Sequence, residues 1–122
     1  MNYLVDTTIL IDHLRGQSAA TNWLLATRGH AISVITRAEI LGGMRPKEED
    51  VTRSLLNQLA LLSIDIEVAD VAASYRRLYW KSHQLLLPDA LIAATAKIHG
   101  MTLATLNVKD FPMEDIQILR PY

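Results

Sequence analysis

The sequence predicts an α/β protein in which a mostly parallel sheet of short strands lies between layers of helices. Short apolar runs alternate along the chain with longer segments of helical periodicity, and glycine or proline marks most of the boundaries between them. Strands that alternate with helices in this way usually pair in parallel. With 122 residues, half of them hydrophobic, the chain is long enough for a single domain over residues 1–122 with one sizeable core.

The first half of the chain predicts two strands and four helical segments. The mostly apolar residues 2–5 are typical of a buried strand, and the helical pattern after them ends near Gly16, a suitable C-terminal cap. The pattern restarts at Ser18 and ends near Gly29. The next three elements are a strand at 31–35, a helix from an N-cap at Thr36 to Gly42 and Gly43, and a helix at 51–60 after a polar connection at 44–50.

The second half predicts three strands and two helices. Residues 61–64 form a third short apolar run, and 68–82 have the periodicity of a long helix. Pro88 fits the first turn of a helix that runs to His99 and ends at Gly100. The last two apolar runs, 101–106 and 116–119, predict the fourth and fifth strands.

Composition excludes several classes of protein. Twelve basic residues against 13 acidic ones give a net charge of −1, which argues against nucleic-acid binding through bulk positive charge. No apolar run approaches the roughly 20 residues that span a bilayer. The absence of cysteine excludes disulfides and thiolate metal sites and is compatible with a cytoplasmic location. A mean hydropathy of +0.15 suggests a partner or self-association surface in addition to the core.

Two acidic residues interrupt apolar segments where charge is normally excluded. Asp6 follows the first strand, and Asp89 lies between the apolar runs 85–88 and 90–94. A carboxylate in such surroundings is costly unless it is paired, hydrogen-bonded or bound to a cation. If both acids meet in space, a divalent metal is the usual remedy for their repulsion.

Two further acids are expected at the same edge of the sheet. Asp110 follows the fourth strand, and Glu39 lies in the first turn of the helix after the second strand. Ligands of parallel sheets bind outside the carboxyl ends of the strands. Each acid also has a structural explanation: Asp6 as a helix cap, Glu39 as the capping-box partner of Thr36, Asp89 as a complement to its helix dipole, and Asp110 as a turn residue.

The residue types at this edge predict a hard-cation site. Carboxylates without His or Cys partners favour Mg²⁺, with Mn²⁺ as a substitute, and such a metal supports phosphodiester hydrolysis by an activated water. Hydrogen-bonding support is expected from Thr7, Thr105 and Asn107, and Gly42 and Gly43 leave room beside Glu39.

Four segments of the chain resemble the PIN-domain ribonucleases, and most closely the VapC-type toxins of toxin–antitoxin pairs. The segments are Tyr3–Asp12, Thr36–Ile40, Leu87–Ala94 and Thr105–Phe111. The resemblance covers essentially the whole chain and implies a three-layer α/β/α sandwich. It also implies a Mg²⁺-dependent endoribonuclease that leaves a 5′-phosphate and a 3′-hydroxyl, a homodimer, and a cognate antitoxin that blocks the site; transfer RNA is a common target of such toxins.

Asp6, Glu39 and Asp89 match the three main acidic positions of that family. Asp110 matches a fourth, more variable position, at which Asn107 is the alternative. Thr8 departs from the family, which often has asparagine there, and this change removes an amide beside the metal.

Two other functions remain open from the sequence. A receiver-like phosphoacceptor domain also carries acids at strand ends, but it requires an acidic pair after the first strand and a phosphorylated aspartate after a middle strand. Here Thr7 and Thr8 follow Asp6, and Asp65 is the one weak middle aspartate. A catalytically idle binding partner is the second alternative, although all four acids are present.

Overall fold

The computed structural model describes residues 2–122 as an alternation of strands and helices. The strands are β1 (Tyr3–Val5), β2 (His30–Ser33), β3 (Ala60–Leu62), β4 (Thr102–Ala104) and β5 (Ile118–Leu119). The helices are α1 (Thr7–Leu14), α2 (Ser18–Ala26), α3 (Val34–Gly43), α4 (Glu49–Asn57), α5 (Ile66–His83) and α6 (Leu87–Ile98). Two 3₁₀ turns, η1 (Pro46–Glu48) and η2 (Val108–Asp110), precede α4 and follow β4.

The five strands form one sheet in the order β3-β2-β1-β4-β5, and every pairing is parallel. This arrangement confirms the predicted parallel α/β class. The chain adds strands on one side of β1 as far as β3 and then crosses to β4 on the other side. The switch point therefore lies between β1 and β4, where parallel sheets commonly bind ligands at the carboxyl ends of their strands.

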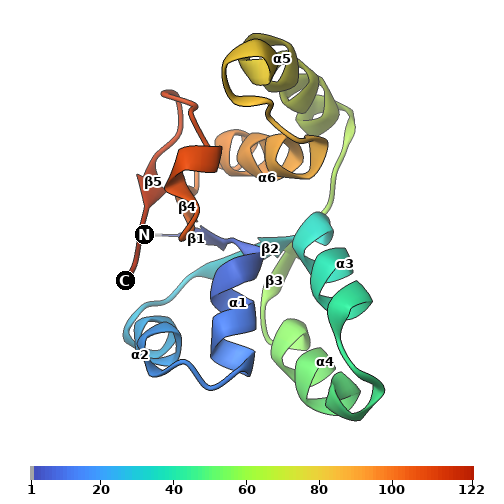
Figure 1. Ribbon diagram of the computed structural model, residues 1–122, viewed down its shortest axis with the longest axis vertical. Coiled ribbons are helices and arrows are strands. Elements are labelled where there is room, and N and C mark those ends of the chain that lie inside the picture. The colour runs from blue at the N-terminus through green and yellow to red at the C-terminus, as the bar shows by residue number, and fades with distance from the viewer. Residues whose placement is uncertain (1) are drawn as a thin grey trace.

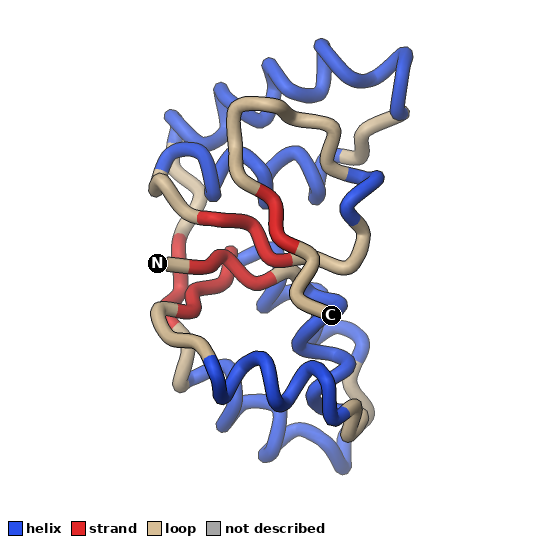
Figure 2. The backbone as a smooth tube through the Cα atoms, turned by 90° about the vertical axis from the view of Figure 1, so that its left-hand side faces the viewer, coloured by secondary structure: helices blue, strands red, loops and turns tan. Residues whose placement is uncertain are grey.

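Helices cover both faces of the sheet, with α5 and α6 on one side and α1 to α4 on the other (Figure 1). Figure 2 shows the strands as a central layer between these two groups. Neighbouring strand residues face opposite cores: Leu4 and Leu103 pack in the cluster with α5 and α6, whereas Val5 and Ala104 pack in the cluster with α1. Full burial of each leucine contributes about 1.5–3 kcal/mol. Because alternate residues of the same short strands face opposite helical layers, these strands hold both layers.

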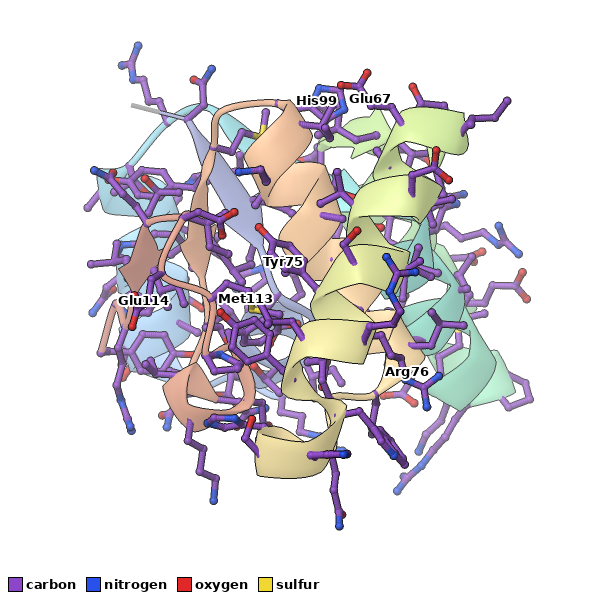
Figure 3. The ribbon with its side chains drawn as sticks, turned by 90° about the horizontal axis from the view of Figure 1, so that it is seen from above. Glu67, Tyr75, Arg76, His99, Met113 and Glu114 are labelled. Atoms are coloured by element: carbon purple, nitrogen blue, oxygen red, sulfur yellow. The ribbon has the colours of Figure 1, made fainter. Side chains whose placement is uncertain are left out.

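The segment between η2 and β5 is fastened to the α5–α6 layer. Tyr75 of α5 lies beside Met113 of this segment in the same buried cluster (Figure 3). The Tyr75 hydroxyl donates to Asp115 Oδ1 at 2.7 Å, and Lys97 Nζ of α6 donates to Asp115 Oδ2 at 2.7 Å. Asp115 therefore links α5 and α6 to the segment that leads into β5. This segment follows η2, which in turn follows β4.

The second strand is shorter than the sequence predicted, and the helix after it starts earlier. Ser33 is the N-cap of α3, since its hydroxyl accepts a hydrogen bond from the backbone N–H of Ile35 at 3.1 Å. The predicted N-cap at Thr36 is therefore wrong, because another capping residue lies three positions earlier at the end of β2. Thr36 lies inside α3 instead and is fully buried.

None of the helices within residues 2–122 is both long and apolar enough to cross a membrane.

Candidate active site at the carboxyl edge of the sheet

Asp6 lies directly at the switch point and is almost fully buried, with 5% of its surface exposed. It follows β1 and is the N-cap of α1, where Oδ1 accepts from the backbone N–H of Thr7 at 2.8 Å. Oδ2 accepts from the hydroxyl of Thr105, just after β4, at 2.7 Å. Burial raises the pKa of Asp6, these two hydrogen bonds oppose the rise, and the charges of Glu39 and Asp110 add to it. The predicted capping role is confirmed. Burial and the charges of Glu39 and Asp110 nevertheless disfavour the ionised form of this carboxylate.

Glu39 reaches the same place from α3. Its Oε1 accepts a hydrogen bond from the Thr7 hydroxyl at 2.8 Å. Because α3 begins at Val34, Glu39 lies in the second turn of the helix, and its prediction as a first-turn residue is wrong. The capping-box explanation for Glu39 fails with it, since Ser33 performs the capping. The structure therefore gives Glu39 contacts at the sheet edge in place of a role at its own helix terminus.

Asp89 lies in the first turn of α6, after Pro88, as predicted. Its carboxylate is half-buried, and burial is the main reason that its pKa rises to about 6. The charges of Asp6, Asp110 and Glu39 add to the rise, in that order. The helix N-terminus still favours a negative charge here, so that explanation stands beside the functional one.

Asp110 lies at the end of η2 and is exposed. Its backbone N–H donates to the carbonyl of Asn107 at 2.9 Å, and the N–H of Asn107 donates to the Thr105 hydroxyl at 3.0 Å. Thr105 therefore joins the loop that carries Asp110 to the buried carboxylate of Asp6. The negative charge of Asp110 raises the pKa of both Asp6 and Asp89, so it acts on the same site.

The fold thus brings all four predicted acids to one edge of the sheet from four distant segments. Within residues 2–122, no group of three acidic or histidine side chains lies close enough together to hold a metal ion in this arrangement. Mutual repulsion favours such separation of like-charged carboxylates. The donor set nevertheless fits Mg²⁺, because it consists of oxygen atoms and because a cation would relieve the charges that raise the pKa of Asp89.

A groove of about 500 Å³ opens beside Glu39, between α1, the end of α3 and η1. Ile11, Leu14 and Ile40 supply apolar walls, and Arg15 and Arg45 supply positive charge. Gly43 lines the same groove, and a Cβ atom built there would meet nothing within 4 Å. The arginines give this groove, which Glu39 and Glu48 also line, two groups that can bind phosphate.

Three threonines support the acids, and the sequence identified only part of their role. Thr7 and Thr105 make the predicted hydrogen bonds to site carboxylates. Thr36, predicted as a cap, has its hydroxyl 3.3 Å from that of Thr7. The available signal was its position three residues before Glu39, which places both on one helix face.

Thr8 has the one buried side-chain oxygen without a hydrogen-bond partner among the described residues. It is also the position at which this sequence departs from the resemblance described above. Threonine therefore leaves a polar atom unsatisfied next to Thr7 and Asp6.

The receiver-like alternative finds no support in the topology. Asp65, the aspartate that it would require, follows β3 at the edge of the sheet and not a middle strand. Its Oδ1 caps α5 by accepting from the backbone N–H of Val68 at 2.9 Å.

Comparison with known proteins finds similar sequences and similar folds over nearly the whole chain. The family model of the PIN domain matches residues 3–112. Ribonuclease VapC10 of Mycobacterium tuberculosis is 44% identical over 114 residues, which cover 90% of this chain and 86% of that protein. A toxin–antitoxin complex from Klebsiella pneumoniae contains a chain with a TM-score of 0.85 and 34% identity, covering 100% of this chain and 98% of the other. FitAcB from Neisseria gonorrhoeae gives a TM-score of 0.79 and 31% identity over 98% and 97%.

Proposed function

This chain belongs to the PIN domain family, and from that premise we propose that it is the ribonuclease toxin of a toxin–antitoxin pair. Relatives and structural neighbours that carry ribonuclease and toxin–antitoxin names support the proposal. The observation that carries it is the convergence of four carboxylates at the switch point, with the pKa of Asp89 raised to about 6 by burial and by the other three charges. Such clusters of perturbed acids are typical of functional sites.

We assign the four acids, Asp6, Glu39, Asp89 and Asp110, as the residues that hold Mg²⁺, or Mn²⁺ in its place. When bound, the cation supplies activation of water and neutralises charge on the phosphodiester. Asp6 is the most rigid of the four, since both of its carboxylate oxygens accept hydrogen bonds from the protein. Asp110 is exposed, and its loop also presents Asn107, which remains the alternative fourth ligand.

The substrate in this proposal is RNA, and Arg15 and Arg45 of the groove beside Glu39 are suited to its phosphates. The partners are a cognate antitoxin and a second copy of this chain. Large apolar side chains that remain exposed, such as Leu78, Trp80 and Leu86, provide surface for such association. Because the proposed substrate is RNA, we expect the protein to act in the cytoplasm.

Cleavage of RNA by the purified protein tests the proposal. We expect Mg²⁺-dependent cleavage that EDTA abolishes, with transfer RNA included in the panel of substrates. Asp6→Asn should remove cleavage while preserving the folded state, because it removes a charge that the site requires. Asp70→Asn, which changes an exposed aspartate of α5, is the matched control and should cleave like the wild type.

Unchanged cleavage in EDTA, or in the Asp6→Asn variant, would contradict the proposal. Calorimetric titration with Mg²⁺ distinguishes the nuclease from a catalytically idle binding partner. The nuclease requires cation binding at these acids, and the idle partner does not.

A further inference from the structure

Thr36 places a buried hydroxyl at the end of a short chain of polar contacts that leads to Glu39. Its side chain is fully buried inside α3, one turn before Glu39. Its Oγ1 lies 3.3 Å from Oγ1 of Thr7, which in turn lies 2.8 Å from Glu39 Oε1. This series of contacts connects the buried side chain of Thr36 to the carboxylate of Glu39 through Thr7, the first residue of α1.

The direction of these hydrogen bonds follows from the number of protons. Each threonine hydroxyl has one proton to donate, and an ionised carboxylate only accepts. The Thr7 hydroxyl can donate to Thr36 or to Glu39, but not to both at once. The distance to Glu39 is the shorter, at 2.8 Å. When it donates to Glu39, Thr36 can donate to Thr7 across the 3.3 Å contact and so orient the Thr7 hydroxyl toward Glu39.

Glu39 has particular need of such support. It is exposed, and its long side chain loses considerable rotational freedom when it is held in one place. Asp6 is held by two donors from rigid positions, whereas the hydrogen bond that the structure gives the Glu39 carboxylate comes from Thr7. An interaction that orients the Thr7 hydroxyl therefore also helps to hold the Glu39 carboxylate in position.

We propose that Thr36 is a positioning residue of the active site, which acts through Thr7 to hold the carboxylate of Glu39 ready for the cation. This inference rests on the proposed function, in which Glu39 is a metal ligand. It predicts that the hydroxyl of Thr36 affects cation binding, although Thr36 itself touches neither the cation nor RNA.

The test compares two substitutions by calorimetric titration with Mn²⁺ and by thermal unfolding. Thr36→Val removes the hydroxyl and keeps the shape, and we expect it to weaken Mn²⁺ binding about 10-fold or more, as for other residues that support metal ligands. Thr36→Ser keeps the hydroxyl and should bind Mn²⁺ like the wild type. Thr95→Val is the matched control, because Thr95 is equally buried but its hydroxyl donates to the carbonyl of Leu91 within α6.

A double-mutant cycle identifies the route of the effect. If Thr36 acts through Glu39, Thr36→Val should cause little further loss of binding in a Glu39→Gln background. Equal Mn²⁺ affinity in Thr36→Val and the wild type, equal weakening in Thr36→Ser, or a full additional loss in the Glu39→Gln background would each overturn the inference. A wild type that binds Mn²⁺ but leaves RNA intact refutes the nuclease proposal, and the titrations still decide the role of Thr36. A wild type that binds no Mn²⁺ overturns both.

Discussion

Replacing Asp89 by asparagine is expected to stabilise the metal-free protein while it abolishes RNA cleavage. The pKa of Asp89 rises from 3.8 to about 6 because the fold buries its carboxylate and places three other acids around it. At neutral pH the Asp89 carboxylate is still ionised, but its charge costs free energy in the folded state that it does not cost in the unfolded chain. Asparagine keeps the shape of the side chain without the charge, so the variant escapes this cost.

The size of the effect follows from the pKa. A rise from 3.8 to about 6 corresponds to about 3 kcal/mol. Because the side chain is only half-buried, solvent screening reduces this to about 1.5 kcal/mol. Asparagine also loses the favourable interaction of the carboxylate with the N-terminus of α6, which lowers the expected gain in stability by about 0.5 kcal/mol. A net gain of about 1 kcal/mol should raise the Tm by about 3–6 °C.

The sign of the pH dependence is fixed by the direction of the pKa change. A carboxyl group whose pKa is raised on folding destabilises the protein above the folded pKa, and the cost is relieved as it takes up a proton. The advantage of Asp89→Asn should therefore be present at pH 7.5, shrink through pH 6 and disappear near the unfolded value of 3.8. Thermal unfolding in EDTA measures it, with Asp70→Asn as the control.

Added Mg²⁺ should reverse the order, because it stabilises the wild type more than the variant. A variant that is less stable than the wild type at pH 7.5 in EDTA, or a gain that is the same at pH 7.5 and pH 4, would refute this reasoning.

Two other substitutions test residues next to Asp6. Thr105→Val removes the hydroxyl that donates to Asp6 Oδ2, and calorimetry should show Mg²⁺ affinity reduced by about 10- to 100-fold; an unchanged affinity would contradict the supporting role of Thr105. Thr8→Val replaces a buried hydroxyl that has no partner, so urea unfolding should show a gain of about 1 kcal/mol, since an unsatisfied buried polar group is costly. A loss of stability in Thr8→Val would show that this hydroxyl makes a favourable interaction.

The sequence was sufficient for the order of elements because its signals are local. Apolar runs, helical periodicity and the glycine and proline boundaries identified the five strands and six α-helices within residues 2–122, but not the two 3₁₀ turns η1 and η2. They failed at the start of α3, where Ser33 and Thr36 are both competent N-caps. The choice between them depends on where β2 stops pairing with β3, at Ser33, and that is a property of the sheet.

The site was predictable at the level of which acids share an edge, because parallel strands place their carboxyl ends together. Its hydrogen bonds were predictable only in part. Thr105 reaches Asp6 because β4 lies next to β1 in the sheet. Thr7 reaches Glu39 because of the way in which α1 packs against α3. Neither packing leaves a mark in the sequence near these residues.

The hydrogen bond between Thr105 and Asp6 joins positions that are 99 residues apart. During synthesis on a ribosome, β1 and α1 emerge long before β4, and Asp6 then lacks both its hydroxyl donor and the acids that follow. A chain that stops before β4 carries at most Asp6, Glu39 and Asp89, without Thr105 or Asp110 to complete the edge. Nascent chains and prematurely ended translation products should therefore be harmless to the RNA around them, and toxicity should begin only when the late strands join the sheet.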